Sequence, residues 1–262
     1  MESLLIRRRG RALIATLNRA EAHNALNGAT VDALNQALDQ PPADAELRLL
    51  VIAGQPGVFC TGTDFTTLVA ETITEQEAVT AAARQYYRTL ARFSASPRLI
   101  ACQVDGRTQA GGLGLVAACD YALCTPHSTF NLPEVLLGLV PAVVLPFLTR
   151  RIGWQRAYAL TLTARALDAA QALAFGLVDE VGVDSEESLR RLLLAMDRTP
   201  AASLKAAKRY CQGLWPLAAT TEDRAVAQIT ELLADPVALD TIRTLQQHGL
   251  WGYCQVVEST AF

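Results

Sequence analysis

The sequence predicts an α/β core of repeated strand–helix units, followed by a mostly helical C-terminal region. Three observations lead to this prediction. Short apolar runs of strand length alternate with segments of helical spacing in the first half of the chain. Helical segments dominate the second half. Of the 262 residues, 51% are apolar and 19% are charged, which suffices to bury a substantial core.

Strands and helices are expected to alternate in the first half of the chain. Four apolar runs have the length and composition of strands: residues 11–17, 47–53, 99–104 and 121–124. A helix is expected from Thr30, the predicted N-cap, to the proline pair that begins at Pro41. A second helix should open with a capping box at Thr74–Glu77 and carry Tyr86 on its apolar face. The small apolar residues 110–118 predict a third helix, packed closely on the sheet.

The second half is predicted to be mostly helical. Helical patterns cover residues 143–152, 154–162, 168–175 and 185–196. Thr199-Pro200 and Asp235-Pro236 each combine an N-cap residue with proline at the first helical position, so two more helices should begin there. We therefore expect a core over residues 1–195 and a helical region over 196–262 that packs against it.

Composition excludes several classes of protein. A net charge of −3 gives no bulk attraction to nucleic acid. No uncharged apolar run approaches the ~20 residues that cross a membrane, and Arg7–Arg9 follow Ile6 without the apolar stretch of a secretory signal. The six cysteines lack CxxC spacing and the three histidines are scattered, so reduced thiols and no metal site are expected. A cytoplasmic globular protein without nucleic-acid or membrane partners is predicted.

Three stretches contain more glycine and turn residues than a core needs: residues 57–65, 106–115 and 130–141. Glycines at a helix start let backbone N–H groups approach a ligand, and the helix N-terminus adds positive potential. Two such N–H groups from different loops would form an oxyanion hole for a carbonyl oxygen. Glu134 lies among Leu132, Val135 and Leu136, where a desolvated carboxylate could transfer protons.

A dinucleotide-binding fingerprint is a remote alternative for the second stretch. Residues 112–117 match G-x-G-x-x-A. That fingerprint needs a strand running almost directly into the first glycine and an acid that ends a second strand about 20 residues later. Here residues 105–110 intervene, and Glu134 follows a proline instead. Nicotinamide binding is therefore disfavoured.

Four ordered motifs resemble the crotonase (enoyl-CoA hydratase/isomerase) superfamily over most of the chain. Residues 18–27, NRAEAHNALN, resemble its N-R-P-x-x-x-N-A-L-N, with Ala20 in place of proline. Residues 58–65, VFCTGTDF, resemble its F-x-x-G-x-D-[LF] loop. Residues 106–120 resemble its G-x-x-x-G-G-G-x-x-L-x-x-x-C-D segment, and residues 130–141 its F-x-x-P-E-x-x-x-G-x-x-P segment.

This resemblance implies a fold and a class of substrate. The fold would be a spiral of ββα units over residues 1–195 that holds a thioester site. The helical region 196–262 would serve oligomerisation, as a trimer or dimer of trimers, and act as a lid. The substrate would be carried on the phosphopantetheine of acyl carrier protein or CoA, with no further cofactor.

The resemblance also implies roles for individual residues. The two oxyanion-hole amides of the family fall on Thr63 and Gly112, and its paired glutamates fall on Gly114 and Glu134. Only Glu134 is an acid, so hydration with two carboxylates is not available. We expect Glu134 to be catalytic, with Asp64 as a further candidate that could instead cap a helix. The remaining residues expected at the pocket are Cys60, Gln109, Gly111 and Gly114, for which packing roles are the alternative.

A narrower resemblance concerns residues 59–65, 110–114 and 138–153. These segments are similar to dehydratases of polyketide β-branching, which act on 3-hydroxy-3-methylglutaryl groups on acyl carrier protein. The resemblance implies a lyase that forms a 3-methylglutaconyl thioester. The alternatives are a degradative enoyl-CoA hydratase or isomerase, a decarboxylase, and a non-catalytic thioester-binding subunit. Because carrier proteins are acidic and this chain is negative, a local basic patch is expected, formed by Arg150, Arg151, Arg156, Lys205 and Lys208.

Overall fold

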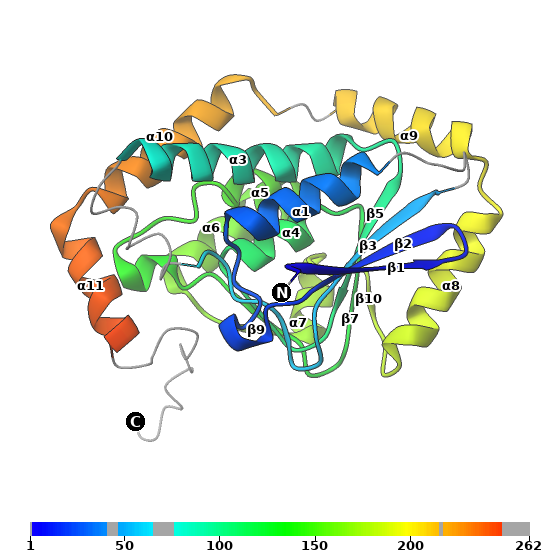
Figure 1. The fold of residues 1–262 in the computed structure, drawn as a ribbon, viewed down its shortest axis with the longest axis horizontal. Helices are drawn as coiled ribbons and strands as arrows, with labels where there is room; N and C mark the ends of the chain where they lie inside the picture. The colour runs from blue at the N-terminus through cyan, green and yellow to red at the C-terminus, as the bar shows by residue number, and fades with distance from the viewer. Residues whose placement is uncertain (1, 41–46, 65–75, 215–216, 248–262) are drawn as a thin grey trace.

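Two β-sheets form the centre of the computed structural model, which describes residues 2–40, 47–64, 76–214 and 217–247 (Figure 1). The larger sheet has the order β1-β2-β3-β5-β7-β10, in which only β1 and β2 pair antiparallel. Its strands are β1 (Leu4–Arg9), β2 (Ala12–Leu17), β3 (Leu49–Ala53), β5 (Leu99–Val104), β7 (Tyr121–Cys124) and β10 (Glu180–Val181). The smaller sheet comprises β4 (Val58–Cys60), β6 (Arg107–Gln109), β8 (Thr129–Asn131) and β9 (Leu167–Asp168).

The chain winds through both sheets as a spiral. A strand of the larger sheet is followed by one of the smaller sheet and then by a helix. The helices of this pattern are α3 (Gln76–Ala95) and α4 (Gly111–Ala118), whereas α1 (Gly28–Asp39) follows β1 and β2 of the larger sheet. The units β3–β4–α3 and β5–β6–α4 repeat the pattern, so the predicted core of ββα units is confirmed. The parallel pairs β4–β6 and β6–β8 bring the ends of these successive units side by side.

Apolar side chains are buried on both faces of the larger sheet. Because side chains alternate along a strand, Leu50 and Ile52 of β3 join the same apolar cluster as residues of α1, α3 and α4, whereas Val51 points to the other face. That second face is covered by Leu189 of α8 (Ser185–Asp197). Figure 1 shows α1 and α3 on one side of the sheet and α8 on the other. Burial on both faces is typical of parallel strands.

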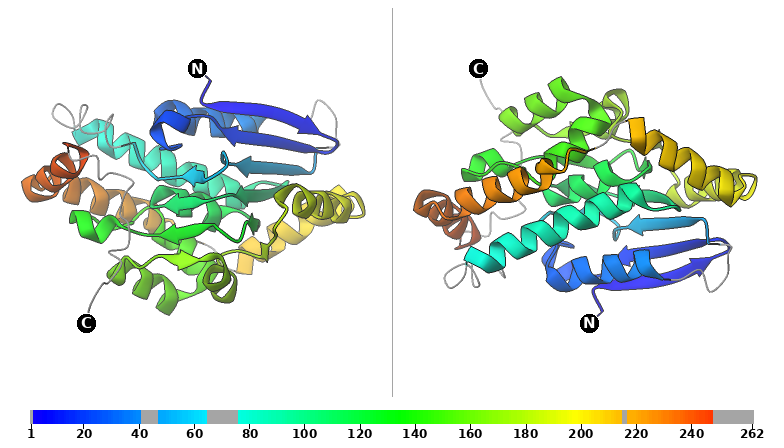
Figure 2. Two further views of the ribbon diagram at one scale, coloured as in Figure 1. Left: turned by 90° about the horizontal axis from the view of Figure 1, so that it is seen from below. Right: turned by 90° about the horizontal axis from the view of Figure 1, so that it is seen from above.

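The second half is helical, as predicted. Its further helices are α5 (Leu145–Ile152), α6 (Trp154–Thr163), α7 (Ala169–Phe175), α9 (Ala201–Leu214), α10 (Thr220–Leu233) and α11 (Pro236–Gln247). The predicted cap of α11 is present, since Asp235 accepts from the Val237 N–H at 2.8 Å. The views of Figure 2 place α10 alongside α3, and an ion pair of 2.8 Å joins Arg84 to Glu222 there. The boundary at residue 195 and trimerisation stay predictions.

Local differences from the predicted elements have simple causes. Asn27, not Thr30, is the N-cap of α1, because its Oδ1 accepts from the Thr30 N–H three residues later, at 2.9 Å. Residues 4–9 form an edge strand, in agreement with the expectation that the run Arg7–Arg9 lies on a solvated strand edge. The strands of the smaller sheet are too short for a periodic signal. Thr74 of the expected capping box lies outside the described residues. No helix in the described ranges has the length and apolar character needed to span a membrane.

Candidate active site

The connection between β2 and α1 supports one wall of the site. Asn24 adopts a left-handed backbone conformation, with φ of 55°, and its Oδ1 accepts from the Arg19 N–H at 2.9 Å. Its amide donates to the carbonyl of Val58 at 3.1 Å. The Arg19 guanidinium in turn donates to Ala25 and forms a 2.7 Å ion pair with Asp64. The first sequence motif therefore fixes the loop that follows β4.

That loop presents the Thr63 amide to the interior of the molecule. Leu26 donates to the Gly62 carbonyl at 2.7 Å, and the Asp64 N–H donates to the Leu26 carbonyl at 2.8 Å. These two bonds form a parallel bridge between Leu26 and Thr63. In a parallel bridge the residues that flank Thr63 make the hydrogen bonds to Leu26. The N–H of Thr63 itself therefore points away from Leu26.

The first turn of α4 lies on the side of Thr63 that faces away from Leu26. Ala110 precedes the helix with φ of 49° and ψ of −123°, a conformation that L-residues rarely adopt. It is held by a bond from its N–H to Asn131 and by one from the Leu113 N–H to its carbonyl. A methyl group on Gly111 would lie 3.6 Å from the Thr63 nitrogen. Two backbone amides from separate loops thus come together at a helix N-terminus, where the dipole favours negative charge.

Glu134 is a buried acidic group at this site that forms no ion pair within the described residues. It begins a short 3-10 helix, η2 (Glu134–Leu137), directly after Pro133. The side chain is 7% exposed, and its Oε2 accepts no hydrogen bond within the described part of the chain. Burial raises the pKa of Glu134 to about 8, because the carboxylate loses its hydration.

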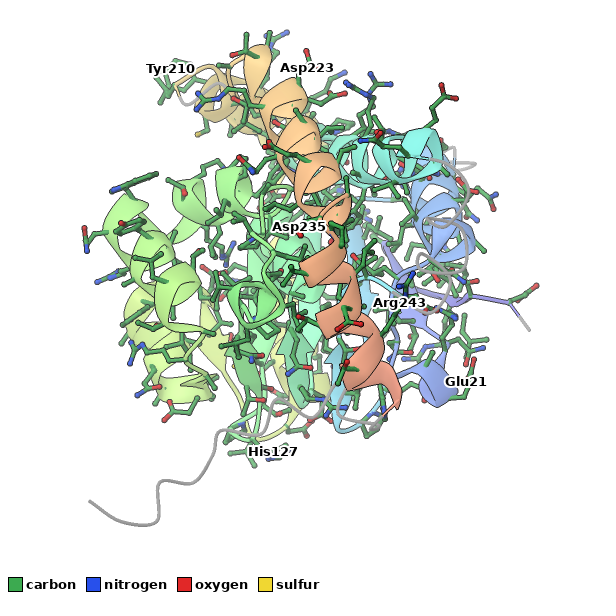
Figure 3. All side chains as sticks on the ribbon, turned by 90° about the vertical axis from the view of Figure 1, so that its left-hand side faces the viewer. Glu21, His127, Tyr210, Asp223, Asp235 and Arg243 are labelled. Carbon is green, nitrogen blue, oxygen red and sulfur yellow. The ribbon has the colours of Figure 1, made fainter. Side chains whose placement is uncertain are left out.

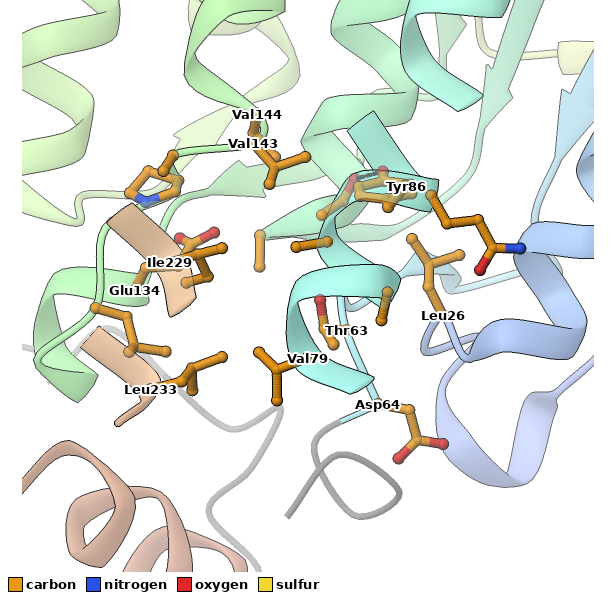
Figure 4. Close-up of a pocket in the computed structure, with 18 of the residues that line it drawn as sticks. Leu26, Thr63, Asp64, Val79, Tyr86, Glu134, Val143, Val144, Ile229 and Leu233 are labelled. Carbon is orange, nitrogen blue, oxygen red and sulfur yellow. Dashed lines mark hydrogen bonds between the residues drawn. The ribbon is translucent and has the colours of Figure 1, made fainter. Parts of the chain in front are cut away.

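A cavity of about 220 Å³ brings these groups together. Thr63, Asp64, Gly111 and Glu134 line it with a mostly apolar wall that includes Val79, Tyr86, Leu139, Val144, Ile229 and Leu233 (Figure 4). Ile229 and Leu233 belong to α10, so the C-terminal helical region of the same chain covers the cavity. Figure 3 shows α10 running from near Asp223 to Asp235, where α11 begins. Two convergent amides beside one desolvated carboxyl are suited to enolate chemistry on a thioester.

A family model described as enoyl-CoA hydratase/isomerase matches residues 9–249 of the chain. The chain belongs to the enoyl-CoA hydratase/isomerase family. The bacillaene synthase dehydratase PksH of Bacillus subtilis is 29% identical over 235 residues, which cover 90% of either protein. A Rhizobium meliloti protein described as an enoyl-CoA hydratase is 32% identical over 207 residues, 79% of this chain and 78% of its own length.

Solved structures agree with the fold. The crystal structure of a Bacillus subtilis protein described as a polyketide biosynthesis enoyl-CoA hydratase matches with a TM-score of 0.85 at 29% identity. The match covers 93% of this chain and 97% of that one. These relatives confirm the predicted crotonase fold and an enzyme of the enoyl-CoA hydratase type, a hydro-lyase.

The structure separates the predicted site residues of this family member into two groups. Thr63, Asp64, Gly111 and Glu134 line the cavity. The remaining predicted residues are not among those that line it: Cys60, Gln109, Gly112 and Gly114.

Packing accounts for the second group. A methyl group on Gly112 would lie 2.4 Å from the Cys60 carbonyl oxygen, so Gly112 permits α4 to approach β4. Cys60 is fully buried, and burial raises the pKa of its thiol to about 12. Gln109 is a buried residue of β6. Gly114 faces the hydroxyl of Tyr86.

Asp64 reaches the wall of the cavity but its carboxylate is already engaged. Its side chain is 6% exposed and paired with Arg19. Figure 4 shows it pointing away from Glu134. The geometry therefore favours a supporting role for Asp64 in the loop over proton transfer.

The sequence did not identify Tyr86 or the α10 residues as part of the site. Tyr86 was predicted only as a member of the apolar face of its helix, and that placement is correct. Its hydroxyl nevertheless donates a short hydrogen bond to the Gly111 carbonyl at the rim of the cavity. A polar hydroxyl on an otherwise apolar stripe was the available signal. Ile229 and Leu233 gave none, because apolar residues at helical spacing are the rule in packed helices.

The predicted basic patch is wrong in two of its members. The Arg151 side chain is 9% exposed and donates to Asp179 and to the carbonyls of Leu177 and Cys119. The Lys208 side chain is 10% exposed and forms an ion pair with Asp120. These two side chains bind carbonyls and carboxylates of the same chain, so they are not free to attract an acidic partner.

Gly62→Ala is expected to disrupt both stability and ligand binding. Gly62 has φ of 92°, and an added methyl group would lie 2.6 Å from that of Ala110 and 2.9 Å from the Gly111 nitrogen. Gly57→Ala is the matched control, with φ of 86° and open space around the added methyl. Both should lose roughly 1–2 kcal/mol from left-handed strain in urea unfolding. Gly62→Ala alone should lose more stability than this and should also weaken thioester binding. Equal effects of the two substitutions would contradict the close approach of Gly62 to Ala110 and Gly111.

Glu134→Gln should change how stability depends on pH. The Glu134 pKa is raised from 4.5 to about 8 in the folded protein. Between these values the folded chain retains a proton that the unfolded chain has lost, so this group makes stability fall as pH rises, until about pH 8. The Tm advantage of Glu134→Gln over wild type should therefore grow from pH 5 to pH 8. The exposed Glu21→Gln variant is the control, and parallel Tm curves for Glu134→Gln and wild type would exclude a buried carboxyl.

Proposed function

We propose that this enzyme dehydrates a 3-hydroxy-3-methylglutaryl thioester on acyl carrier protein to the 3-methylglutaconyl thioester, in polyketide β-branching. One observation carries the proposal: Glu134, whose Oε2 has no hydrogen-bond partner among the described residues, shares a cavity with two convergent amides, while the position of a second acid is Gly114. The similarity to the bacillaene synthase dehydratase PksH supports the choice of a dehydratase and of a carrier-borne substrate.

The elimination needs only this one carboxylate. Glu134 removes the C2 proton, and the electron pair of the C2–H bond moves into the thioester carbonyl as an enolate. The two amides stabilise the negative oxygen. The electrons then form the C2–C3 double bond while the C3–O bond breaks. The departing hydroxyl takes the proton from Glu134 and leaves as water, which restores the carboxylate. Both proton transfers use the same face of the substrate.

The second oxyanion amide is assigned to Gly111 in this proposal. The sequence motif alone suggested Gly112. Gly111 lines the cavity next to Thr63, whereas Gly112 packs against Cys60. Thr63 keeps the role expected for it. The shift by one residue follows from the tight turn at Ala110, which directs the next N–H into the cavity.

A degradative enoyl-CoA isomerase or hydratase is the second candidate. The described lining contains Asn27 and Gln85 but no Lys, Arg or His. A 3-hydroxy-3-methylglutaryl group would thus meet no cation there for its distal carboxylate, and an alkyl chain suits the apolar wall better. An isomerase, which moves a proton between two carbons, also needs only one carboxylate.

Glu134→Gln is expected to abolish turnover and leave thioester binding intact. The loss should be ~10²–10⁴-fold in kcat, the usual effect of a general acid–base. Because the carboxylate is the base, wild-type kcat/KM for dehydration should rise with pH to a plateau above about 8. Asp64→Asn, the comparison variant, should lose much less. Retention of more than a tenth of the activity by Glu134→Gln would rule out the one-carboxylate mechanism.

A substrate comparison distinguishes the candidates. The 3-hydroxy-3-methylglutaryl group should be dehydrated with higher kcat/KM on acyl carrier protein than on CoA, as followed by mass spectrometry. Faster conversion of 3-enoyl-CoA or crotonyl-CoA would favour the degradative isomerase or hydratase. Tight binding without conversion of any of these thioesters would indicate a non-catalytic subunit.

A further inference from the structure

Tyr86 and Gly114 face one another at the wall of the cavity. A methyl group on Gly114 would lie 2.9 Å from the Tyr86 hydroxyl oxygen and 3.1 Å from both Leu90 and Val144. A side chain at position 114 would therefore have to enter space that the Tyr86 hydroxyl already occupies. Tyr86 is 8% exposed and lines the cavity together with Gly111 and Glu134. The phenol fills the volume where a second acid would have stood.

The same hydroxyl is bonded to the start of α4. It donates to the Gly111 carbonyl in a buried hydrogen bond. Gly111 and Gly112 lack Cβ atoms and so have more backbone freedom than other residues. The turn before them contains Ala110 in a sparsely populated conformation, which costs about 1–3 kcal/mol and persists only where surrounding contacts hold it. Tyr86 supplies one of those holding contacts from a different element, α3.

We propose that Tyr86 is a positioning residue that replaces the missing side chain at position 114 and fixes the oxyanion turn through the Gly111 carbonyl. Because this role concerns the amides that would bind a thioester carbonyl, the inference rests on the proposed function. It assigns the Tyr86 hydroxyl to the protein backbone and leaves Glu134 as the group that exchanges protons with the substrate. It also removes space for a second proton-transfer group, which restricts this site to reactions that one carboxylate can perform.

The protonation of Tyr86 agrees with this role. Burial raises the pKa of its hydroxyl, and the nearby Glu134 acts in the same direction. The phenol therefore stays protonated and remains a hydrogen-bond donor at neutral pH. A tyrosine acting as a base would require the opposite shift.

A chromophoric thioester tests the positioning role directly. The absorbance of cinnamoyl-CoA moves to longer wavelength when hydrogen bonds polarise its carbonyl, so the shift on binding reports the geometry of the oxyanion amides. Tyr86→Phe should reduce this red shift and lower kcat about tenfold, the equivalent of one hydrogen bond, with little change in KM. An unchanged red shift with unchanged kcat would overturn the proposal.

Tyr87→Phe is the matched control. Tyr87 is the next residue of α3 and is 4% exposed, with its ring against Phe147 at 5.3 Å between centroids. It is not among the residues that line the cavity. The same loss of a hydroxyl should leave the red shift and kcat at wild-type values. If the two substitutions have equal effects, the Tyr86→Phe result reflects a general loosening of α3 and the positioning role is contradicted.

A double-mutant cycle tests the shared volume. Gly114→Ala should lower Tm in the wild-type background, because its methyl group meets the Tyr86 oxygen. In the Tyr86→Phe background the oxygen is gone, so the same substitution should cost clearly less. Equal Tm losses in the two backgrounds would show that the residues do not compete for space.

These measurements separate the inference from the proposed reaction. Carbonyl polarisation and Tm are read without turnover, and cinnamoyl-CoA carries no 3-hydroxy-3-methylglutaryl group. If that substrate is not dehydrated but the red shift still depends on Tyr86, the proposed function fails and the positioning role stands. If dehydration occurs and the red shift ignores Tyr86, the positioning role fails alone.

Discussion

The close approach of the 61–64 loop to the first turn of α4 is the contact on which the site depends. Two loops from successive ββα units can meet there because Gly62 has no side chain between them and Gly112 has none between α4 and β4. The approach is fixed from one side by the Leu26–Thr63 bridge and from the other by the bonds of Ala110. Backbone packing therefore places two amide groups at the first turn of α4, where the helix dipole favours negative charge.

The C-terminal helices complete the wall of the cavity. Ile229 and Leu233 of α10 form part of the cavity wall. Ala238 and Ile242 of α11 share an apolar cluster with Leu137 and Leu139, which flank the turn that carries Glu134. The raised pKa of Glu134 comes from desolvation and not from a neighbouring charge. The C-terminal region therefore adds to the apolar surroundings that bury the catalytic candidate.

Sequence alone predicted the parts of this site that are encoded locally. Glycine-rich turns, the lone acid at Glu134 and the strand–helix alternation all leave short-range patterns, and the structure places the motifs around one cavity. Contacts between distant segments were the parts that could not be predicted. The choice between Gly111 and Gly112 depends on the backbone conformation of Ala110, which no residue pattern reveals. Likewise, the ion pair of Lys208 with Asp120 joins residues 88 positions apart, and no local pattern indicates it.

A single carboxyl that must both accept and donate a proton works best when its pKa lies near the pH of the surroundings. The structure meets this requirement with apolar burial. Among the described residues that line the cavity there is no Lys, Arg or His, and burial raises the pKa of Glu134 to about 8. A second acid at position 114 would alter that balance, since two nearby carboxyls cannot both ionise easily. Gly114 and Tyr86 therefore both keep a second carboxyl away from Glu134. The first removes a competing charge, and the second fills the space with a neutral donor that is committed to the backbone.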